Sequence, residues 1–316
     1  MSTNRSVWPA DARGGSGTEM DAGKDGRRTS PLFEATLLST AILLGTNPVA
    51  VKYAVGYIPP LPFAALRFIM AGLVLLAILR LLDPKKRRVK RKDLWALAGV
   101  GAIGVALNNV AFTFGVSMAS ASDTALIVAT APLWGMLLGF VLGLERPKLQ
   151  GLVGVGLALL GVGVIVYRGL GASGTSLTGD LLVMGAAACW GSYAVLSLPL
   201  LRRYSPLEVA TYTMLFGGLA VLPLASLSFL STDWGAVSAE GWAAAGYSAL
   251  LVAAFGFTSW QRGVARIGAN RMLVYQYVVT LVGVFAGVML FDEGFGIDKA
   301  LGATILLGGV YLARRQ

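Results

Sequence analysis

The chain of 316 residues contains no histidine and only one cysteine, Cys189. It therefore lacks the commonest metal ligand of proteins and the side chain best suited to titrate near neutral pH. A single cysteine allows no internal disulfide. The sequence also shows no metal-ligand spacing, no glycine-rich phosphate loop after a strand and no nucleophile with a base. We expect no catalytic residue, no metal and no cofactor, and no enzymatic function.

Charged side chains are scarce as well, at 13% of the residues, whereas 56% are hydrophobic. A soluble chain has about 25% charged residues. Long, nearly uncharged apolar runs recur along the sequence, and a run of about 20 such residues spans a bilayer. This composition predicts a protein that crosses the lipid bilayer many times.

The apolar runs predict an all-α integral membrane protein, because lipid offers no partner for unpaired backbone groups. Residues 1–31 are polar and aperiodic, which predicts a disordered tail. This tail is too long and polar for a signal peptide. We predict ten transmembrane helices at residues 35–56, 62–82, 94–116, 122–143, 149–168, 180–200, 207–230, 242–261, 270–291 and 297–314.

The net charge of +10 raises the question of nucleic-acid binding. With the amino terminus in the cytoplasm, nearly all basic residues fall on the cytoplasmic side, as the positive-inside rule requires. The exceptions are Lys52, Arg67, Arg168 and Lys299. We therefore expect no nucleic acid, a position in the inner or plasma membrane and two cytoplasmic termini. The basic run at 85–92 is either a topology anchor facing anionic lipid or a lipid site.

Two stretches of the sequence repeat one another. Residues 131–145 read APLWGMLLGFVLGLE and residues 279–293 read VTLVGVFAGVMLFDE. Glycines four residues apart let helices approach closely in membranes, and here they are Gly135 and Gly139, matched by Gly283 and Gly287. The repeat divides the chain into residues 32–168 and 179–314, each with five helices. Because five is odd, the halves must be inverted, as in secondary transporters, and the glycine faces are predicted packing surfaces on which they rock.

Lys52 and Arg67 are charged residues within predicted spans. Burying such a charge costs at least about 2.5–3.5 kcal/mol. The Pro-rich turn at 59–62 joins their helices, so the two cations can lie close together and hold a carboxylate or phosphate. Alternatively, Lys52 extends outward to the interface and Arg67 binds helix-end carbonyls.

Several uncharged polar residues also interrupt the apolar spans. Asn47 precedes Pro48, which predicts a kink that marks either a transport site or simple packing. Buried amides such as Asn108 and Gln276 either bridge helices or face a pathway. The same choice applies to Asn109. Trp190 and Tyr193 offer either a stacking and hydrogen-bonding surface or ordinary membrane-interface aromatics. Thr280 shares a helix face with Gln276 at i, i+4, which favours a polar strip in the second half.

Acidic residues are absent from the middle of the predicted spans and lie near their ends, for example Asp123, Glu145 and Asp180. A buried proton relay is hard to build from this set. We therefore expect exchange or facilitated movement, or coupling to protons at the membrane edge through Asp123. Glu145 and Glu293 are interpreted as helix-end residues.

Three segments resemble EamA-type proteins of the drug/metabolite transporter superfamily. They are LLGTNPVAVKYAVGYIPPLPFAALRF, SDTALIVATAPLWGMLLGFVLGLERPKLQGLVGVGLALLGVGVIVY and GANRMLVYQYVVTLVGVFAGVMLFDEGFGIDKALGATILLGGVYLA. The resemblance implies a ten-helix, inverted-repeat carrier, often an exporter of amino acids or related metabolites. It matches the family's polar positions at Asn47, Lys52 and Arg67 and its proline at Pro132, and it departs from the pattern at Thr280.

Together these features predict a secondary transporter that exports a small polar or amphipathic metabolite by alternating access. The alternatives are a sugar-phosphate or nucleotide-sugar exchanger and, from other classes, a lipid-modifying enzyme or a channel. Monomer and homodimer both stay open. The predicted substrate-binding residues are Asn47, Lys52, Arg67, Asn108, Trp190, Tyr193, Gln276 and Thr280.

Overall fold

The computed structural model describes residues 30–82, 89–143, 149–169, 176–267, 272, 274–291, 294 and 296–314. This part of the chain is helical and contains no strand, which confirms the all-α class. Seven segments within it are long and apolar enough to cross a membrane, namely Pro31–Ala54, Pro60–Leu82, Arg91–Met118, Ala121–Val141, Leu177–Leu201, Pro206–Ser231 and Ala239–Ile267. Three shorter apolar segments are Leu149–Ile165, Tyr275–Phe291 and Lys299–Leu312.

Helices thus occur at all ten predicted stretches, and the protein is a multi-pass membrane protein. The number of crossings and the two inverted repeats stay predictions. The predicted tail lies almost wholly outside the described residues, as does the first half of the basic run at 85–92. Glu145 and Glu293 also lie outside them.

The first span is broken near its middle, as Pro48 predicts. Helix α1 (Pro31–Gly45) ends one residue before α2 (Asn47–Ala54) begins, with Thr46 between them. Proline has no N–H to donate and is tolerated in the first turn of a helix, so α2 starts at this point. The Thr46 hydroxyl donates to the Leu43 carbonyl at 3.0 Å and pairs with the Tyr247 hydroxyl at 2.5 Å.

A second break divides the fourth span. Helix α6 (Ala121–Val128) and α7 (Ala131–Val141) are separated by residues 129–130, and Pro132 lies in the first turn of α7. The Thr130 hydroxyl donates to the Ile127 carbonyl at 2.7 Å. Thr-X-Pro sequences therefore interrupt two spans of the amino-terminal half in the same way.

The remaining helices are mostly continuous. Two segments, η1 and η2, are π-helical, a geometry that is frequent at functional sites. The bounds are α3 Pro60–Leu82, α4 Arg91–Gly101, η1 Ala102–Leu107, α5 Asn108–Met118, α8 Leu149–Gly169, α9 Leu177–Leu201, α10 Pro206–Ser231, α11 Ala239–Gly246, η2 Tyr247–Phe257, α12 Thr258–Ile267, α14 Val274–Phe291 and α15 Ile297–Arg314.

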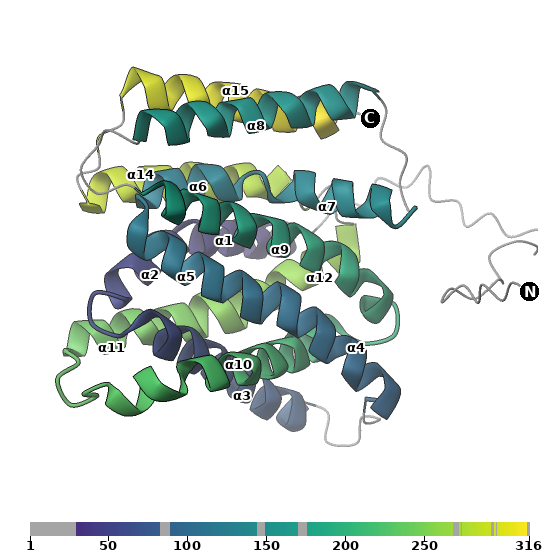
Figure 1. The fold of residues 1–316 in the computed structure, drawn as a ribbon. Helices are drawn as coiled ribbons and strands as arrows, with labels where there is room; N and C mark the ends of the chain where they lie inside the picture. Colours follow the sequence, from purple (N-terminus) through teal and green to yellow (C-terminus); the bar gives the residue numbers. More distant parts are fainter. Residues whose placement is uncertain are drawn as a thin grey trace, which may run out of the picture.

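The helices form layers (Figure 1). Helices α8 and α15 pair at the top edge of the view, with α6, α7 and α14 beneath them, whereas α3 and α10 lie at the opposite edge. The close pairing of α8 with α15 depends on small residues, because a Cβ atom on Gly161 would lie 2.7 Å from the Gly302 carbonyl oxygen. The central helices α1, α2, α5 and α9 lie between these layers.

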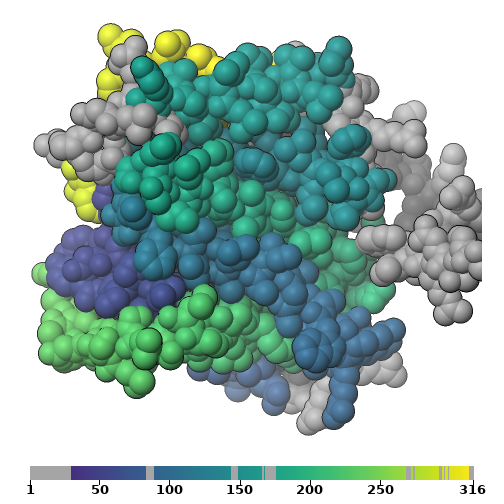
Figure 2. All heavy atoms as spheres, in the orientation of Figure 1, coloured from purple at the N-terminus to yellow at the C-terminus, as the bar shows by residue number. Residues whose placement is uncertain are grey.

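The outside of the bundle is apolar. Figure 2 shows one face, covered by side chains of α5, α8 and the green α10–α11 segment. Leu227 and Leu230 of α10 are 83% and 84% exposed, as suits side chains that contact lipid tails. Polar side chains are concentrated inside, so the functional site must be sought between the helices.

Candidate functional site

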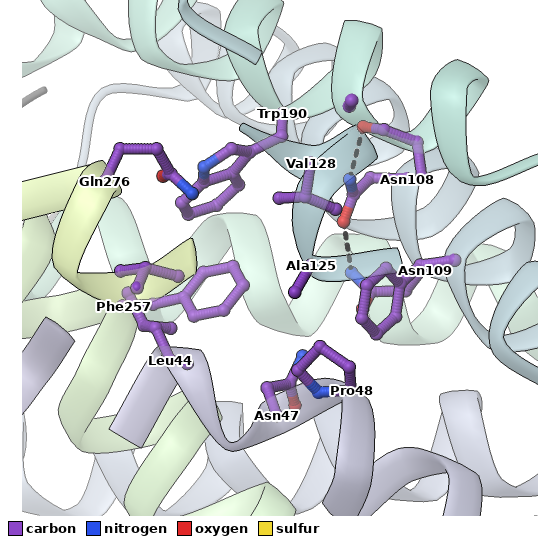
Figure 3. A pocket seen from close by; sticks show the side chains of 15 residues that line it. Leu44, Asn47, Pro48, Asn108, Asn109, Ala125, Val128, Trp190, Phe257 and Gln276 are labelled. Atoms are coloured by element: carbon purple, nitrogen blue, oxygen red, sulfur yellow. Dashed lines mark hydrogen bonds between the residues drawn. The ribbon is translucent and has the colours of Figure 1, made fainter. Parts of the chain in front are cut away.

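A cavity lies among the central helices and contains about 630 Å³ of space free of protein atoms, part of it open to the outside. The lining comes from both halves of the chain (Figure 3). The lining residues are Leu44, Gly45, Asn47, Pro48, Asn108, Asn109, Phe112, Ala125, Val128, Ala186, Ala187, Trp190, Phe257, Gln276 and Val279.

The helix break between α1 and α2 places backbone and amide groups at the cavity. Asn47 and Pro48 form the first turn of α2 and line the cavity. A helix amino terminus carries partial positive charge, and half-helices use this end to face anionic groups in transporters. The break therefore gives this part of the cavity a preference for negative charge.

Asn108 and Asn109 present two adjacent amides at the start of α5, directly after η1. Asn108 Nδ2 donates to the Ala186 carbonyl at 2.7 Å, and Asn109 Nδ2 donates to Asn108 Oδ1 at 3.0 Å and to the Val105 carbonyl at 2.8 Å. Asn108 therefore bridges α5 to α9 and also lines the cavity. These hydrogen bonds fix the direction of both amides.

Aromatic rings cover the opposite side of the cavity. Figure 3 shows Trp190 and Phe257 facing the amide pair across the space. Their ring centroids are 4.8 Å apart in an edge-on arrangement. Tyr193 stacks on Trp190 at 5.6 Å and does not line the cavity. The Tyr193 hydroxyl shares a hydrogen bond of 3.1 Å with Thr213, so this residue holds Trp190 in place.

Gln276 of α14 completes the polar lining. Its side chain is 4% exposed, and its Nε2 has no hydrogen-bond partner among the described residues. An unpaired buried donor costs about 1–3 kcal/mol, which a bound acceptor group would recover. Thr280, one turn along, donates its hydroxyl to the Gln276 carbonyl at 3.0 Å and does not line the cavity.

Arg67 lies behind Asn47 and is not a lining residue. Its guanidinium donates from Nη2 to Asn47 Oδ1 at 3.0 Å and lies 4.8 Å from the Phe68 ring centroid. The residue is 2% exposed, and neither Nε nor Nη1 has a hydrogen-bond partner in the described part of the chain. A buried cation therefore stands one side chain away from the cavity.

Lys52 lies farther along α2 and does not line the cavity either. Its Nζ donates to the Ala119 carbonyl at 2.9 Å and lies 5.4 Å from the Phe291 ring centroid. The cavity thus collects four of the eight predicted residues, namely Asn47, Asn108, Trp190 and Gln276. Arg67, Tyr193 and Thr280 each contact one of these four, whereas Lys52 binds elsewhere.

Pro48 and Trp190 were predicted from the sequence, but the lining residues Phe257 and Val128 were not. Phe257 and Val128 lie in apolar stretches that carry no local signal, because a ring facing a cavity and a ring facing lipid look alike in sequence. One sequence feature points to Phe257, because it precedes Thr258 and Gln261, two polar residues of the same predicted span. Among the described residues, no group of three His, Cys, Asp or Glu side chains could hold a metal ion.

A polar cluster joins α4 to the turn before α10, away from the cavity. Asp93 accepts from Arg203 Nη1 at 3.2 Å and from the Tyr204 hydroxyl at 2.7 Å. Burial and the hydrogen bond to Asp93 raise the pKa of Tyr204 above its ordinary value of 10.0. Helix α10 itself begins with a capping box, in which Ser205 and Glu208 bond one another's backbone N–H groups.

Most of the chain matches one known protein family. The sequence profile of the EamA-like transporter family matches residues 33–167 and 177–315. The chain belongs to this family. The resemblance to EamA-type proteins of the drug/metabolite transporter superfamily is thereby confirmed.

Two curated relatives place this EamA-like chain among named transporters. The uncharacterized transporter YyaM of Bacillus subtilis is 27% identical over 282 residues, which cover 88% of this chain and 92% of YyaM. A Streptantibioticus cattleyicolor protein named "Probable terminal-alkyne amino-acid exporter" is 31% identical over 230 residues, covering 73% of this chain and 76% of that protein.

A solved structure gives the same fold for this EamA-like chain. One crystal structure aligns with a TM-score of 0.63 at 21% identity, covering 89% of this chain and 96% of the other. At this identity the likeness concerns the fold alone.

Proposed function

We propose that this EamA-like protein exports small amphipathic metabolites that carry a carboxylate, amino acids and related compounds above all, across the plasma membrane. The observation that carries the proposal is the cavity, which combines aromatic rings with amides from both halves of the chain. An amino acid has matching parts, because its side chain suits Trp190 and Phe257 and its polar end suits the amides.

The distribution of donors indicates where the carboxylate binds. Gln276 Nε2 lies at the cavity with no hydrogen-bond partner among the described residues. Arg67 lies behind Asn47, and its Nε and Nη1 atoms also have no hydrogen-bond partner there. The α2 amino terminus adds partial positive charge nearby. A carboxylate bound near Asn47 would receive hydrogen bonds from this side, with Arg67 reached by a small shift of Asn47.

The rival substrate class fits this cavity less well. A sugar phosphate or nucleotide sugar needs several cations in direct contact, whereas no Lys or Arg is among the described residues that line the cavity. The relative named an amino-acid exporter also favours the smaller substrate. We therefore place amino acids before phosphorylated substrates.

Alternating access is the proposed mechanism, with ten spans as two inverted repeats and both termini in the cytoplasm. Two matching glycine contacts support the repeat, because the sequence repeat relates Gly154 to Gly302 and Gly161 to Gly309. A Cβ atom on Gly302 would lie 3.1 Å from the Gly161 carbonyl oxygen, and one on Gly309 would lie 2.7 Å from the Gly154 carbonyl oxygen. Reciprocal pairing of this kind is what a two-fold axis generates.

The test is counterflow in proteoliposomes that contain the purified chain and a preloaded substrate. The probe is L-propargylglycine, an amino acid with a terminal alkyne, with L-leucine, L-phenylalanine and glucose 6-phosphate as competitors. We expect saturable counterflow that the amino acids inhibit and the sugar phosphate does not. Flux that neither saturates nor shows counterflow would indicate a channel and contradict the proposal.

Variants link the flux to the cavity. Asn109→Leu removes an amide and fills space, and we expect at least about a ten-fold loss of flux, since a lost buried hydrogen bond plus a clash costs more than about 1.4 kcal/mol. Leu227→Ala on the outside of α10 is the matched control and should keep wild-type flux. Equal fluxes in Asn109→Leu and Leu227→Ala would show that the substrate does not pass through the cavity.

A further inference from the structure

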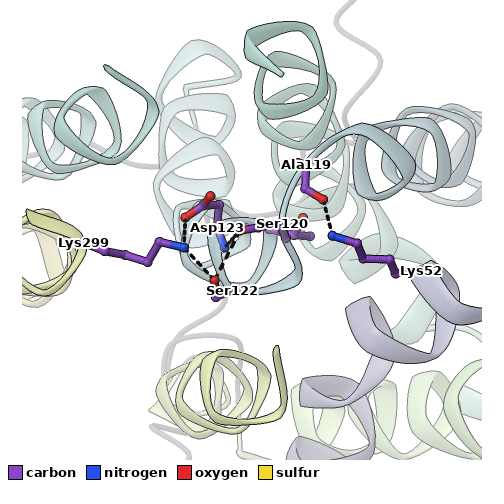
Figure 4. Close-up of polar contacts among 7 residues, drawn as sticks. Lys52, Ala119, Ser120, Ser122, Asp123 and Lys299 are labelled. Atoms are coloured by element: carbon purple, nitrogen blue, oxygen red, sulfur yellow. Dashed lines mark hydrogen bonds and ion pairs between the residues drawn. The ribbon is translucent and has the colours of Figure 1, made fainter. Parts of the chain in front are cut away.

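A buried ion pair joins the beginnings of α6 and α15, and a second carboxylate, Asp180, lies in the first turn of α9. Lys299 Nζ lies 3.0 Å from Asp123 Oδ1 and donates to the Ser122 hydroxyl at 2.8 Å (Figure 4). The Ser120 hydroxyl accepts from the Asp123 N–H at 2.9 Å and fixes the first turn of α6. Asp180 occupies the first turn of α9 and follows Gly179, where a Cβ atom would lie 3.0 Å from the Ala119 backbone nitrogen, so α9 begins beside the first turn of α6.

Both carboxylates are withdrawn from water. Asp123 is 2% exposed and Asp180 is 3% exposed, and Asp180 Oδ1 has no hydrogen-bond partner among the described residues. A buried charge without a partner is costly. With both carboxylates ionised, Lys299 neutralises one of them, and the group keeps one negative charge.

The helices around this cluster carry few charged groups in the described part of the chain. Lys52 of α2 donates to the Ala119 carbonyl on the neighbouring turn. Helices α5, α8 and α14 contribute no charged side chain among those described. The side chains of Arg168, Asp292, Glu293 and Asp298 lie outside the described set.

We propose that Asp123 and Asp180 form a proton-binding site in which the pair holds one proton, and that this proton is the coupling ion of transport. Binding adds H⁺ to an Asp180 carboxylate oxygen and changes no other bond. The loaded cluster holds one carboxylate, one carboxylic acid and Lys299, and is neutral. The inference rests on the proposed function, because it names the ion that drives the carrier.

The position of the cluster makes its proton affinity depend on conformation. Asp123 belongs to the first matched segment, whereas Asp180 and Lys299 belong to the second. Opening this end of the bundle would separate Lys299 from Asp123 and admit water to both carboxylates, so the proton would leave. A ligand can shift a conformational equilibrium only by such a difference in affinity.

The same helices reach the substrate cavity. Asp123 precedes the lining residue Ala125 by less than one turn of α6, and Asp180 precedes Ala186 by about 9 Å along α9 at a rise of about 1.5 Å per residue. Movement of either helix therefore acts on both sites. This arrangement joins proton release to a change at the cavity without a relay across the membrane.

Infrared difference spectroscopy of the purified protein in nanodiscs tests the site without any substrate. The readout is the C=O stretching band of a protonated carboxylic acid, followed as the pH is changed. We expect the wild type to show this band and Asp180→Asn to lack it. Asp93→Asn, at a carboxylate paired with Arg203 and Tyr204, is the matched control and should keep the band.

A variant with the opposite expected effect guards against misfolding. Lys299→Gln removes the neutralising cation, so the band should persist and its midpoint should move upward by about one pH unit or more. A band that is unchanged in both Asp123→Asn and Asp180→Asn, or absent from the wild type, would overturn the proposal.

A transport assay distinguishes a failure of proton coupling from a failure of the proposed carrier function. In proteoliposomes, an imposed pH gradient should drive L-propargylglycine accumulation in the wild type but not in Asp180→Asn, which should still perform counterflow. Gradient-independent accumulation in the wild type would overturn proton coupling and leave the carrier function standing. A proton band without counterflow of any amino acid would remove the proposed substrate class instead.

Discussion

Gly135 of α7 lies so close to Gly191 of α9 that a Cβ atom on Gly135 would be 3.1 Å from the Gly191 carbonyl oxygen. The sequence repeat pairs Gly135 with Gly283 and Gly191 with Gly45. Those partners also meet, since a Cβ atom on Gly283 would lie 3.0 Å from the Gly45 carbonyl oxygen. Each crossing joins one helix from each matched segment, beside the cavity, so both depend on glycine for close backbone approach.

Gly191→Ala should therefore destabilise the protein. Its Cβ would overlap the Ala131 carbonyl oxygen, a backbone atom that cannot move aside without moving α7. Overpacking of this kind costs about 1–3 kcal/mol, and the melting temperature in detergent should fall. Gly185→Ala on the same helix meets no atom within 4 Å and is the control. A Gly191→Ala protein that melts like Gly185→Ala would contradict the close crossing.

Arg67→Met should separate stability from transport. The Arg67 guanidinium is buried with two unpartnered nitrogens in the described part of the chain, and replacing a buried charge by an apolar side chain is often stabilising. We expect a melting temperature higher by roughly 2–4 °C together with at least about a ten-fold loss of L-propargylglycine counterflow, because the carboxylate loses its cation.

Arg203→Met is the control for this prediction. Its side chain is 57% exposed and pairs with Asp93, and exposed ion pairs contribute about 0–1 kcal/mol. Its melting temperature and counterflow should stay near wild type. A fall in the melting temperature of Arg67→Met would show that Arg67 serves the fold and not the substrate.

Tyr204 should make stability depend on alkaline pH. Burial, together with the hydrogen bond that its neutral hydroxyl donates to Asp93, raises the pKa of Tyr204 above 10.0 in the folded protein. A raised folded pKa means that this stabilisation is complete below pH 10 and is lost as the pH rises through the folded pKa. Tyr204→Phe should lower stability by about 1 kcal/mol at pH 8, and the difference from wild type should shrink above pH 10.

The measurement is the melting temperature of both proteins across that pH range. Tyr212→Phe is the control, since the Tyr212 ring stacks on Phe216 and the substitution keeps this contact. The comparison of two proteins cancels the titration of other groups. A difference that grows above pH 10 would contradict the assigned hydrogen bond.

The sequence predicted the fold better than the site. Apolar runs predict helices because lipid admits little else, and Pro48 predicted the α1–α2 break because proline lacks an N–H. The cavity amides Asn108 and Gln276 were predicted because burying an amide costs free energy unless it finds a hydrogen-bond partner. The glycine spacing also predicted close packing at Gly135 and Gly283, although the helices that they meet were not predicted.

Side-chain direction could not be predicted from the sequence. Lys52 and Arg67 looked like one cationic pair, yet Lys52 binds the Ala119 carbonyl and Arg67 binds Asn47. A charge in a span must find a partner, but the sequence does not say which, because the partner comes from another helix. Phe257 was missed for a similar reason, since only packing against Trp190 turns its ring toward the cavity.

Trp190 should set the size of substrate that the cavity accepts, and this prediction tests the aromatic wall directly. The indole packs against Phe257 and Tyr193 and lines the cavity, so Trp190→Ala opens space where the substrate side chain is proposed to lie. A pocket distinguishes side chains that differ by one methylene by about 10–200-fold, so the counterflow ratio of L-tryptophan to L-propargylglycine should rise at least ten-fold. Trp134→Ala does not alter the lining, because Trp134 is not a lining residue and its indole donates to the Thr130 hydroxyl just before α7. Its ratio should equal that of the wild type. If both variants shift the ratio equally, a general loosening of the bundle explains the effect; if only Trp190→Ala does, the indole contacts the transported molecule.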